Sequence, residues 1–96
     1  MGIFSIFKSK KEQFREHVRA CFDESVKKTI KENRDVFNDS SMGGFTGGLM
    51  VQASITSVYQ TLKNEPRLVL LAAKSDFDPY QIIEEECKYA LRKYLE

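Results

Sequence analysis

The sequence predicts an all-α fold, a small helical domain, from three observations. Apolar residues recur at helical spacing over residues 9–37, which contain no glycine or proline. Residues 40–62 carry no charged side chain, although 30% of the whole sequence is charged. The C-terminal stretch begins with residues that typically start a helix. We therefore expect a long N-terminal helix (about 9–37), a central uncharged helix (47–63), a short third helical segment (66–74) and a capped C-terminal helix (79–95).

Residues 9–37 combine an apolar stripe with a charged outer face. Phe14, Val18, Phe22 and Val26 follow one another at steps of four, which places them on one side of a helix. On the outer face, most bases have an acid four residues away, close enough to pair. A helix that binds nucleic acid would present its bases without such acids. We therefore expect a solvated face and regard nucleic acid as an unlikely partner of this helix.

Residues 40–62 allow two secondary structures. Val51, Ile55, Val58 and Leu62 stand three or four positions apart, as in a helix. The β-branched residues of the same stretch also suit a strand. An α+β alternative therefore places a β-hairpin within 49–74, between two helices. Because burying an unpaired charge costs several kcal/mol, the absence of charge leads us to expect that neighbouring helices enclose this element. Its polar residues and glycines argue against a membrane span.

Glycines cluster in the connection that we expect over residues 38–48. Gly43, Gly44, Gly47 and Gly48 suit a flexible loop or a close approach of two helices. A phosphate-binding loop would end in Gly-Lys-Ser/Thr. Here Leu49 follows the last glycine, so a loop or a packing role is the preferred interpretation.

The start of the C-terminal helix has a clear signature. Asp78 is a good N-cap, Pro79 suits the first helical position, and Gln81 stands three residues after the cap, as in a capping box. The three glutamates at 84–86 are consecutive, so they point in different directions around a helix. We expect them to form a solvated run and not a metal site.

The N-terminal segment supplies the candidate contact residues. Four bulky apolar residues precede a basic cluster, an arrangement found in membrane-surface anchors. Packing on the domain itself or on a second copy, contact with a membrane or partner, and a flexible tip over 1–8 all stay open. The candidate partner- or membrane-contacting residues are Ile3, Phe4, Ile6, Phe7, Lys8, Lys10 and Lys11.

Histidine and cysteine, which often form catalytic and metal sites, are scarce in this sequence. His17 is the only histidine, and four positions separate it from Cys21, which belongs to the apolar stripe. Cys21 and Cys87 form no metal-binding spacing, and we expect both to be reduced thiols in a cytoplasmic setting. We identify no catalytic residue, cofactor, metal site or small-molecule substrate.

These observations favour one function and leave an alternative. The 96 residues form one domain with a net charge of +1, which gives no global attraction to polyanions. The first hypothesis is a small non-enzymatic, regulatory protein that acts through protein–protein interaction, including self-association. The alternative is a peripheral module at the inner membrane surface or on nucleic acid, using the N-terminal segment and the bases that follow it, Arg15 and Arg19. An enzyme with an unmarked site is the third hypothesis.

Overall fold

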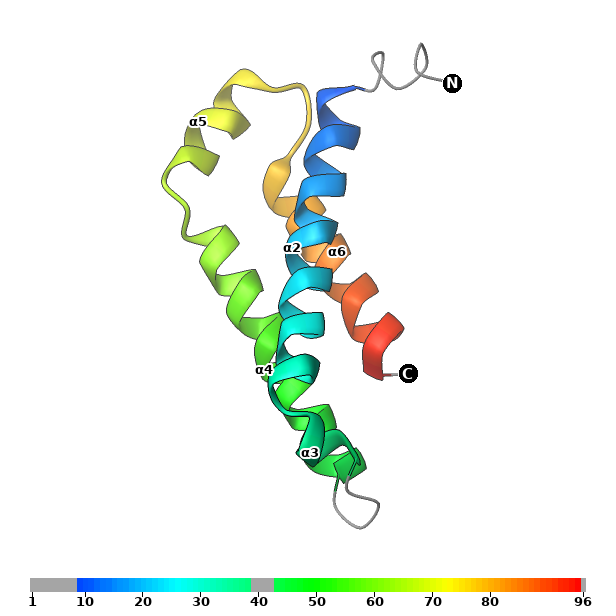
Figure 1. Cartoon of the computed structure of the whole chain (residues 1–96). Helices are drawn as coiled ribbons and strands as arrows, with labels where there is room; N and C mark the ends of the chain where they lie inside the picture. The colour runs from blue at the N-terminus through cyan, green and yellow to red at the C-terminus, as the bar shows by residue number, and fades with distance from the viewer. Residues whose placement is uncertain (1–8, 39–42, 96) are drawn as a thin grey trace.

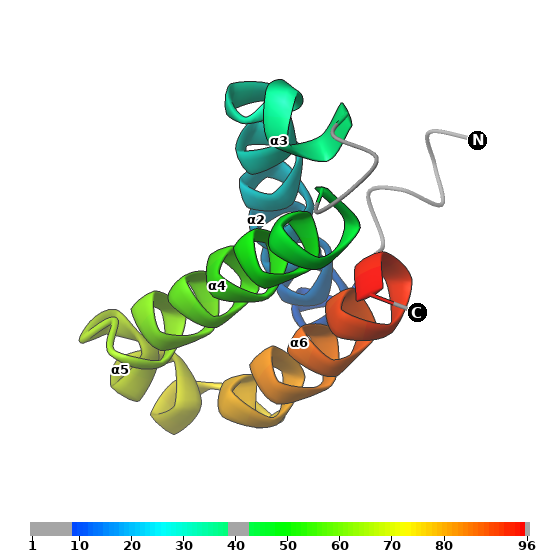
Figure 2. The ribbon, with the colours of Figure 1, turned by 90° about the horizontal axis from the view of Figure 1, so that it is seen from below.

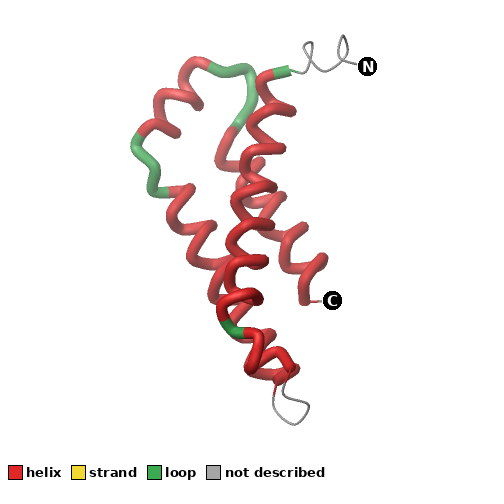
Figure 3. Tube along the Cα trace, in the orientation of Figure 1, coloured by secondary structure: helices red, strands yellow, loops and turns green. Residues whose placement is uncertain are grey.

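The computed structural model describes residues 9–38 and 43–95, and within these ranges all regular structure is helical (Figures 1 and 3). The all-α prediction is therefore confirmed. The alternative hairpin within 49–74 is wrong, because these residues form helices and the turn between them. The helices are α2 (Lys10–Glu32), α3 (Arg34–Asn38), α4 (Gly43–Lys63), α5 (Arg67–Lys74) and α6 (Pro79–Leu95).

Three long helices form the body of the domain. α2, α4 and α6 each contact the other two. α2 and α6 run in the same direction and α4 runs in the opposite one (Figure 1). Figure 2 shows α4 and α6 side by side, with α5 joining them at one end. The short connection through α5 thus allows the chain to turn back and place its last helix beside its first.

The core lies where the apolar stripes of these three helices meet. Val18, Phe22 and Val26 of α2 are completely or almost completely buried, as their four-residue spacing predicts. Ile55 of α4 and Ile83 of α6 are equally inaccessible. Burying each such side chain contributes roughly 1.5–3 kcal/mol, so this three-helix contact is the main apolar stabilisation of the fold.

The long first helix ends earlier than the sequence predicts. α2 stops at Glu32, and Asn33 leaves the helical conformation with φ −128° and ψ 38°. Its side-chain amide donates to the carbonyl of Thr29 (2.8 Å), and its backbone N–H donates to the carbonyl of Ile30. An asparagine side chain that bonds the preceding turn competes with helix continuation. The short α3 then follows as a separate element.

The central helix begins earlier than predicted, within the glycine cluster. α4 starts at Gly43, so Gly43–Gly48 belong to a helix and not to a loop. Gly47 is buried, and a Cβ atom at this position would lie 2.7 Å from Cε1 of Phe37 in α3. The missing side chain lets α3 pack directly on the first turns of α4, which was the second interpretation of these glycines.

The last two helices begin close to their expected positions. Pro66 immediately precedes α5, with helical dihedral angles. Asp78 caps α6: its Oδ1 accepts from the backbone N–H groups of Tyr80 (2.9 Å) and Gln81 (3.4 Å). The Gln81 side chain donates to Glu85 instead of returning to the cap. The cap is therefore confirmed through Asp78.

The uncharged helix is only half enclosed. Val51 and Ile55 are buried against α2 and α6, but Gln52 and Thr56 are exposed and Leu49 keeps 51% of its surface accessible. The expectation that neighbours enclose this element is therefore wrong for its outer side. No helix of the described chain covers that side, because α2 and α6 both pack on the opposite one.

Candidate functional site

The candidate N-terminal contact residues lie at the edge of what the structure describes. Lys10 and Lys11 occupy the first turn of α2, and both are exposed. The remaining candidates precede Ser9 and lie outside the described residues; they are Ile3, Phe4, Ile6, Phe7 and Lys8. Their contacts therefore stay a prediction.

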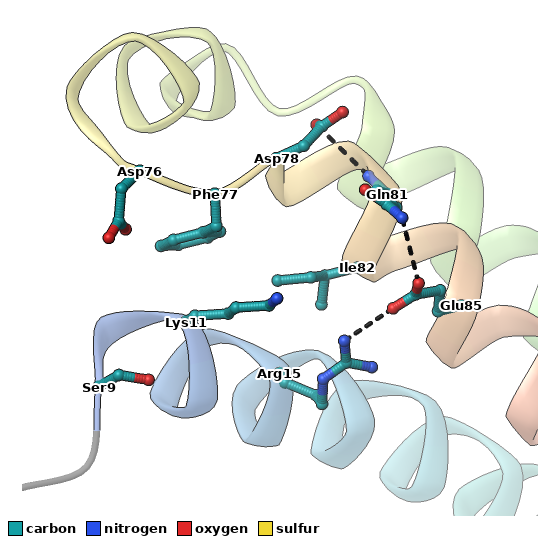
Figure 4. A pocket seen from close by; sticks show the side chains of 9 residues that line it. All are labelled: Ser9, Lys11, Arg15, Asp76, Phe77, Asp78, Gln81, Ile82 and Glu85. Carbon is teal, nitrogen blue, oxygen red and sulfur yellow. Dashed lines mark hydrogen bonds and ion pairs between the residues drawn. The ribbon is translucent and has the colours of Figure 1, made fainter.

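A cavity of about 540 Å³ lies between the start of α2 and the loop that leads into α6. In Figure 4, Phe77 of the loop and Ile82 of α6 form its apolar part, and the Lys11 side chain extends between them and α2. Asp76 lies beside Phe77 on the same loop, across the cavity from α2. The lining therefore mixes both signs of charge with a small apolar surface.

Most polar groups that line this cavity form hydrogen bonds that stabilise the fold. Ser9 Oγ accepts from the backbone N–H of Glu12 (3.1 Å) and so caps α2. Asp78 caps α6, and Glu85 accepts from Arg15 Nη2 at 2.7 Å. A catalytic hydroxyl needs a neighbouring base to activate it, and the hydroxyl here is occupied as a cap. Capping thus accounts for the one hydroxyl side chain that lines this cavity.

Next to this cavity, a buried acid joins the first and last helices. Glu86 is 2% exposed and accepts from two arginines of α2: Oε2 from Arg15 Nη1 (2.8 Å) and Oε1 from Arg19 Nε (2.6 Å). Burial would raise the pKa of Glu86, but the hydrogen bonds from Arg19 and Arg15 outweigh it and hold this pKa below its ordinary value. Glu86 is therefore charged and fully paired.

The contacts of Glu86 correct the expectation for the glutamates and show what Arg15 and Arg19 bind. The expected solvated run of glutamates is wrong for Glu86, although Glu84 and Glu85 are exposed. Arg15 and Arg19, which the alternative hypothesis assigned to a polyanion, are engaged by α6. The sequence did contain a signal: Glu86 stands between Ile83 and Ala90 at helical spacing, on the buried stripe of α6.

A second polar contact lies further along the same two helices. Asp23 Oδ1 accepts from the hydroxyl of Tyr94 (2.7 Å) and from Lys93 Nζ (3.3 Å). Burial would raise the pKa of Asp23, but these two hydrogen bonds lower it below its ordinary value. Together, the contacts of Glu86 and Asp23 fix the position of α2 along α6.

The histidine and the cysteines show no activation. His17 Nε2 and Cys21 Sγ lie 3.8 Å apart on α2. Burial raises the pKa of the Cys21 thiol, with a further contribution from Glu24, so the thiol stays protonated near neutral pH and is a poor nucleophile. Within residues 9–38 and 43–95, no three His, Cys, Asp or Glu side chains converge as metal ligands would.

The outer side of α4 is exposed to solvent and has no charged side chain. It forms a shallow surface that we call the α4 outer face, and its residues are Leu49, Gln52, Ala53, Thr56, Ser57 and Gln60. A groove of about 520 Å³ borders it on the α2 side, where Ser54 and Ser25 are joined by a hydrogen bond of 2.6 Å. The face and the groove are continuous through Ala53 and Ser57, which line both.

Comparisons with known proteins give no match: no protein-family profile, curated protein or solved structure is similar to this chain. None of the helices in the described ranges has the length and apolar content of a membrane span. The function is therefore argued from the surfaces of the molecule itself.

Proposed function

We propose that this protein acts by binding and not by catalysis, and that the α4 outer face binds a second copy of the chain. The observation that carries the proposal is that this face is exposed yet has no charged side chain along about three helical turns, from Leu49 to Gln60. The outer faces of α2 and α6, in contrast, mix acids and bases. The proposed binding is a weak, reversible self-association.

The energetics of desolvation support this role. A charged side chain loses its hydration when a partner covers it, and it must be paired to offset that loss. The α4 outer face has only amide, hydroxyl and apolar groups to cover. Charged residues are likewise depleted at the centre of protein interfaces. A partner surface without charge is the best match, and a second copy supplies such a surface.

The shape of the face suits the approach of another helix. Ala53 and Ser57 have small side chains one turn apart, so two backbones can come close there. Leu49 is half exposed and offers an apolar anchor at one end, whereas Gln60 can exchange amide hydrogen bonds at the other. In a two-fold dimer the same patch serves both partners, so each contact between two residues of the patch occurs twice.

The expected affinity is low. At 1.5 Å per residue, the 21 residues of α4 span about 30 Å. One helix face of that length provides less than the roughly 800 Å² per partner of a standard stable interface. We therefore expect dissociation in the micromolar range or weaker, which suits a regulatory contact that responds to protein concentration.

Analytical ultracentrifugation over a wide concentration range tests the proposal with a matched pair of variants. Ala53→Glu places one carboxylate in the centre of the α4 outer face. Ala20→Glu places the same group on an exposed position of α2. We expect concentration-dependent dimerisation of the unmodified chain, at least tenfold weaker for Ala53→Glu and unchanged for Ala20→Glu. A chain that stays monomeric at millimolar concentration, or equal effects of both variants, would overturn the proposal.

A further inference from the structure

α5 presents an apolar surface to solvent at the end of the molecule where α2 begins (Figure 1). Leu68 is buried and Leu71 packs against the core, which fixes the inner side of α5. On the outer side, Val69 keeps 62% and Leu70 keeps 60% of its surface accessible. Among the large apolar side chains of the described residues, these two adjacent ones are the most exposed.

Cations flank this apolar surface on both sides. Arg67 and Lys74 are the first and last residues of α5, and both are exposed. Leu70 is three positions after Arg67 and four before Lys74, so the three side chains lie along one side of the helix. α5 itself contains no acid. Its outer side therefore has an apolar centre with Lys74 at one end and Arg67, which is ion-paired with Glu65, at the other.

A third cation comes from the first turn of α2. Lys10 and Lys74 line the same groove of about 560 Å³, whose apolar part includes Phe14 and Leu70. Glu65 is the one carboxylate that lines this groove, and it is hydrogen-bonded to Arg67 Nε at 2.8 Å. Lys10 and Lys74 remain exposed at this end.

We propose that this end of the molecule, the outer side of α5 with Lys10, binds the surface of an anionic phospholipid membrane. Helices that lie in the membrane interface combine an apolar side with flanking Lys and Arg, and each such cation near an anionic surface strengthens binding about fivefold. Val69 and Leu70 project outward, which suits insertion between lipid headgroups better than capture of an acidic peptide. The apolar residues 3–7 directly precede this same end of α2 in the sequence.

Vesicle co-sedimentation with the full chain tests this inference. The probes are phosphatidylcholine vesicles with and without 30% phosphatidylserine. We expect binding to the anionic vesicles alone, with a steep loss of affinity as salt is raised. No binding to anionic vesicles at low salt would overturn the inference, and so would equal binding to both compositions.

Two matched pairs of variants locate the contact. Leu70→Ser removes an exposed apolar side chain from α5, and Ile30→Ser removes one from α2, outside both proposed surfaces. Lys74→Gln removes a cation from α5, and Lys88→Gln removes an exposed one from α6. We expect Leu70→Ser and Lys74→Gln each to weaken vesicle binding about fivefold and the two controls to leave it unchanged. Because the altered side chains are exposed, folding should be retained, which circular dichroism checks.

A deletion separates α5 from the N-terminal segment. Removing residues 2–8 should weaken vesicle binding but leave the effect of Leu70→Ser intact. If binding disappears with the deletion and never depends on Leu70 or Lys74, the membrane contact belongs to the N-terminal segment and the inference for α5 is wrong. If Lys74 matters but Leu70 does not, the contact is electrostatic only, and insertion of α5 is excluded.

Discussion

The contact between α2 and α6 and the outer face of α4 show two opposite uses of charge. At the first, the buried carboxylate of Glu86 is held by Arg15 and Arg19 across the helix pair. At the second, residues such as Gln52 and Thr56 face solvent on a helix that has no charged side chain before Lys63. Charge is thus buried where it is paired, and it is missing from a surface where water would have solvated it without penalty.

The difference teaches that lack of charge does not by itself indicate burial. Burying Glu86 is compatible with stability because both oxygens of its carboxylate accept hydrogen bonds from the arginines. The α4 outer face contains no charged group, so covering it would require hydrogen-bond partners but no ion pairs. The first region joins α2 to α6, and the second region is exposed to solvent.

The largest expected effect separates the two sides of α4. Ile55→Ala should lower the free energy of unfolding by about 2–5 kcal/mol, because it leaves a cavity among α2, α4 and α6. Gln52→Ala, on the outer face, should change it by less than about 0.5 kcal/mol. Urea denaturation followed by circular dichroism measures both. Similar losses for the two variants would mean that the outer face is covered in solution.

A smaller effect is expected at the contact between α2 and α6. Glu86→Gln keeps the size of the side chain but removes its charge, so Arg15 and Arg19 lose their main partner. We expect a loss of about 1–3 kcal/mol in the free energy of unfolding. Glu85→Gln, at the neighbouring exposed acid, is the control and should lower the melting temperature less. Equal effects would show that burial of Glu86 contributes nothing to this contact.

The same contact predicts a pH dependence. The pKa values of Glu86 and Asp23 lie below their ordinary values because of the hydrogen bonds that they accept. Their contribution to stability is therefore present above the unfolded-state pKa and is lost as the pH falls through the lowered folded-state pKa. We expect the melting temperature to fall as the pH decreases below the ordinary carboxylate pKa of 4.5. In the Glu86→Gln variant, the melting temperature should fall less steeply as the pH decreases. The same pH dependence in both proteins would contradict this prediction.

The smallest effects concern two adjacent glycines at the start of α4. Gly48→Ala has room, since its Cβ would lie 4.0 Å from Leu95 Cδ2, and higher helix propensity should stabilise the protein by roughly 0.5–1 kcal/mol. Gly47→Ala would place a Cβ against the ring of Phe37, and the displaced ring should cancel or reverse that gain. Thermal denaturation compares the two. Equal stabilisation would show that α3 moves away from α4 without penalty.

The fold was predictable where the local signals were strong. The cap at Asp78 and the stripe of Val18, Phe22 and Val26 give α6 and most of α2 directly. The end of α2 at Asn33 was not predictable, because it depends on one side-chain hydrogen bond that an asparagine within a helix need not form. The helical state of Gly47 depends on Phe37, a tertiary contact that outweighs the low helix propensity of glycine.

The candidate surfaces were less predictable than the fold. The sequence identifies the neutral stretch, but which side of it is open follows only from how α2 and α6 pack on Ile55. Likewise, Val69 and Leu70 belong to a short apolar run. The sequence does not show which of its residues are buried and which are exposed, because this depends on how Leu68 orients α5 against the core. The role of Arg15 and Arg19 depends on bringing the two ends of the chain together.

The pairing of Arg15 with Glu86 spans 71 positions of the chain. A ribosome makes α2 before α6, so the arginines of the nascent helix remain without this acid until synthesis has reached Glu86. Long loops must then close before the contact forms, which slows this step relative to local helix formation. During that interval the apolar stripe of α2 has only α4 to cover it, and a shortened product that ends before α6 would be exposed to proteases and chaperones.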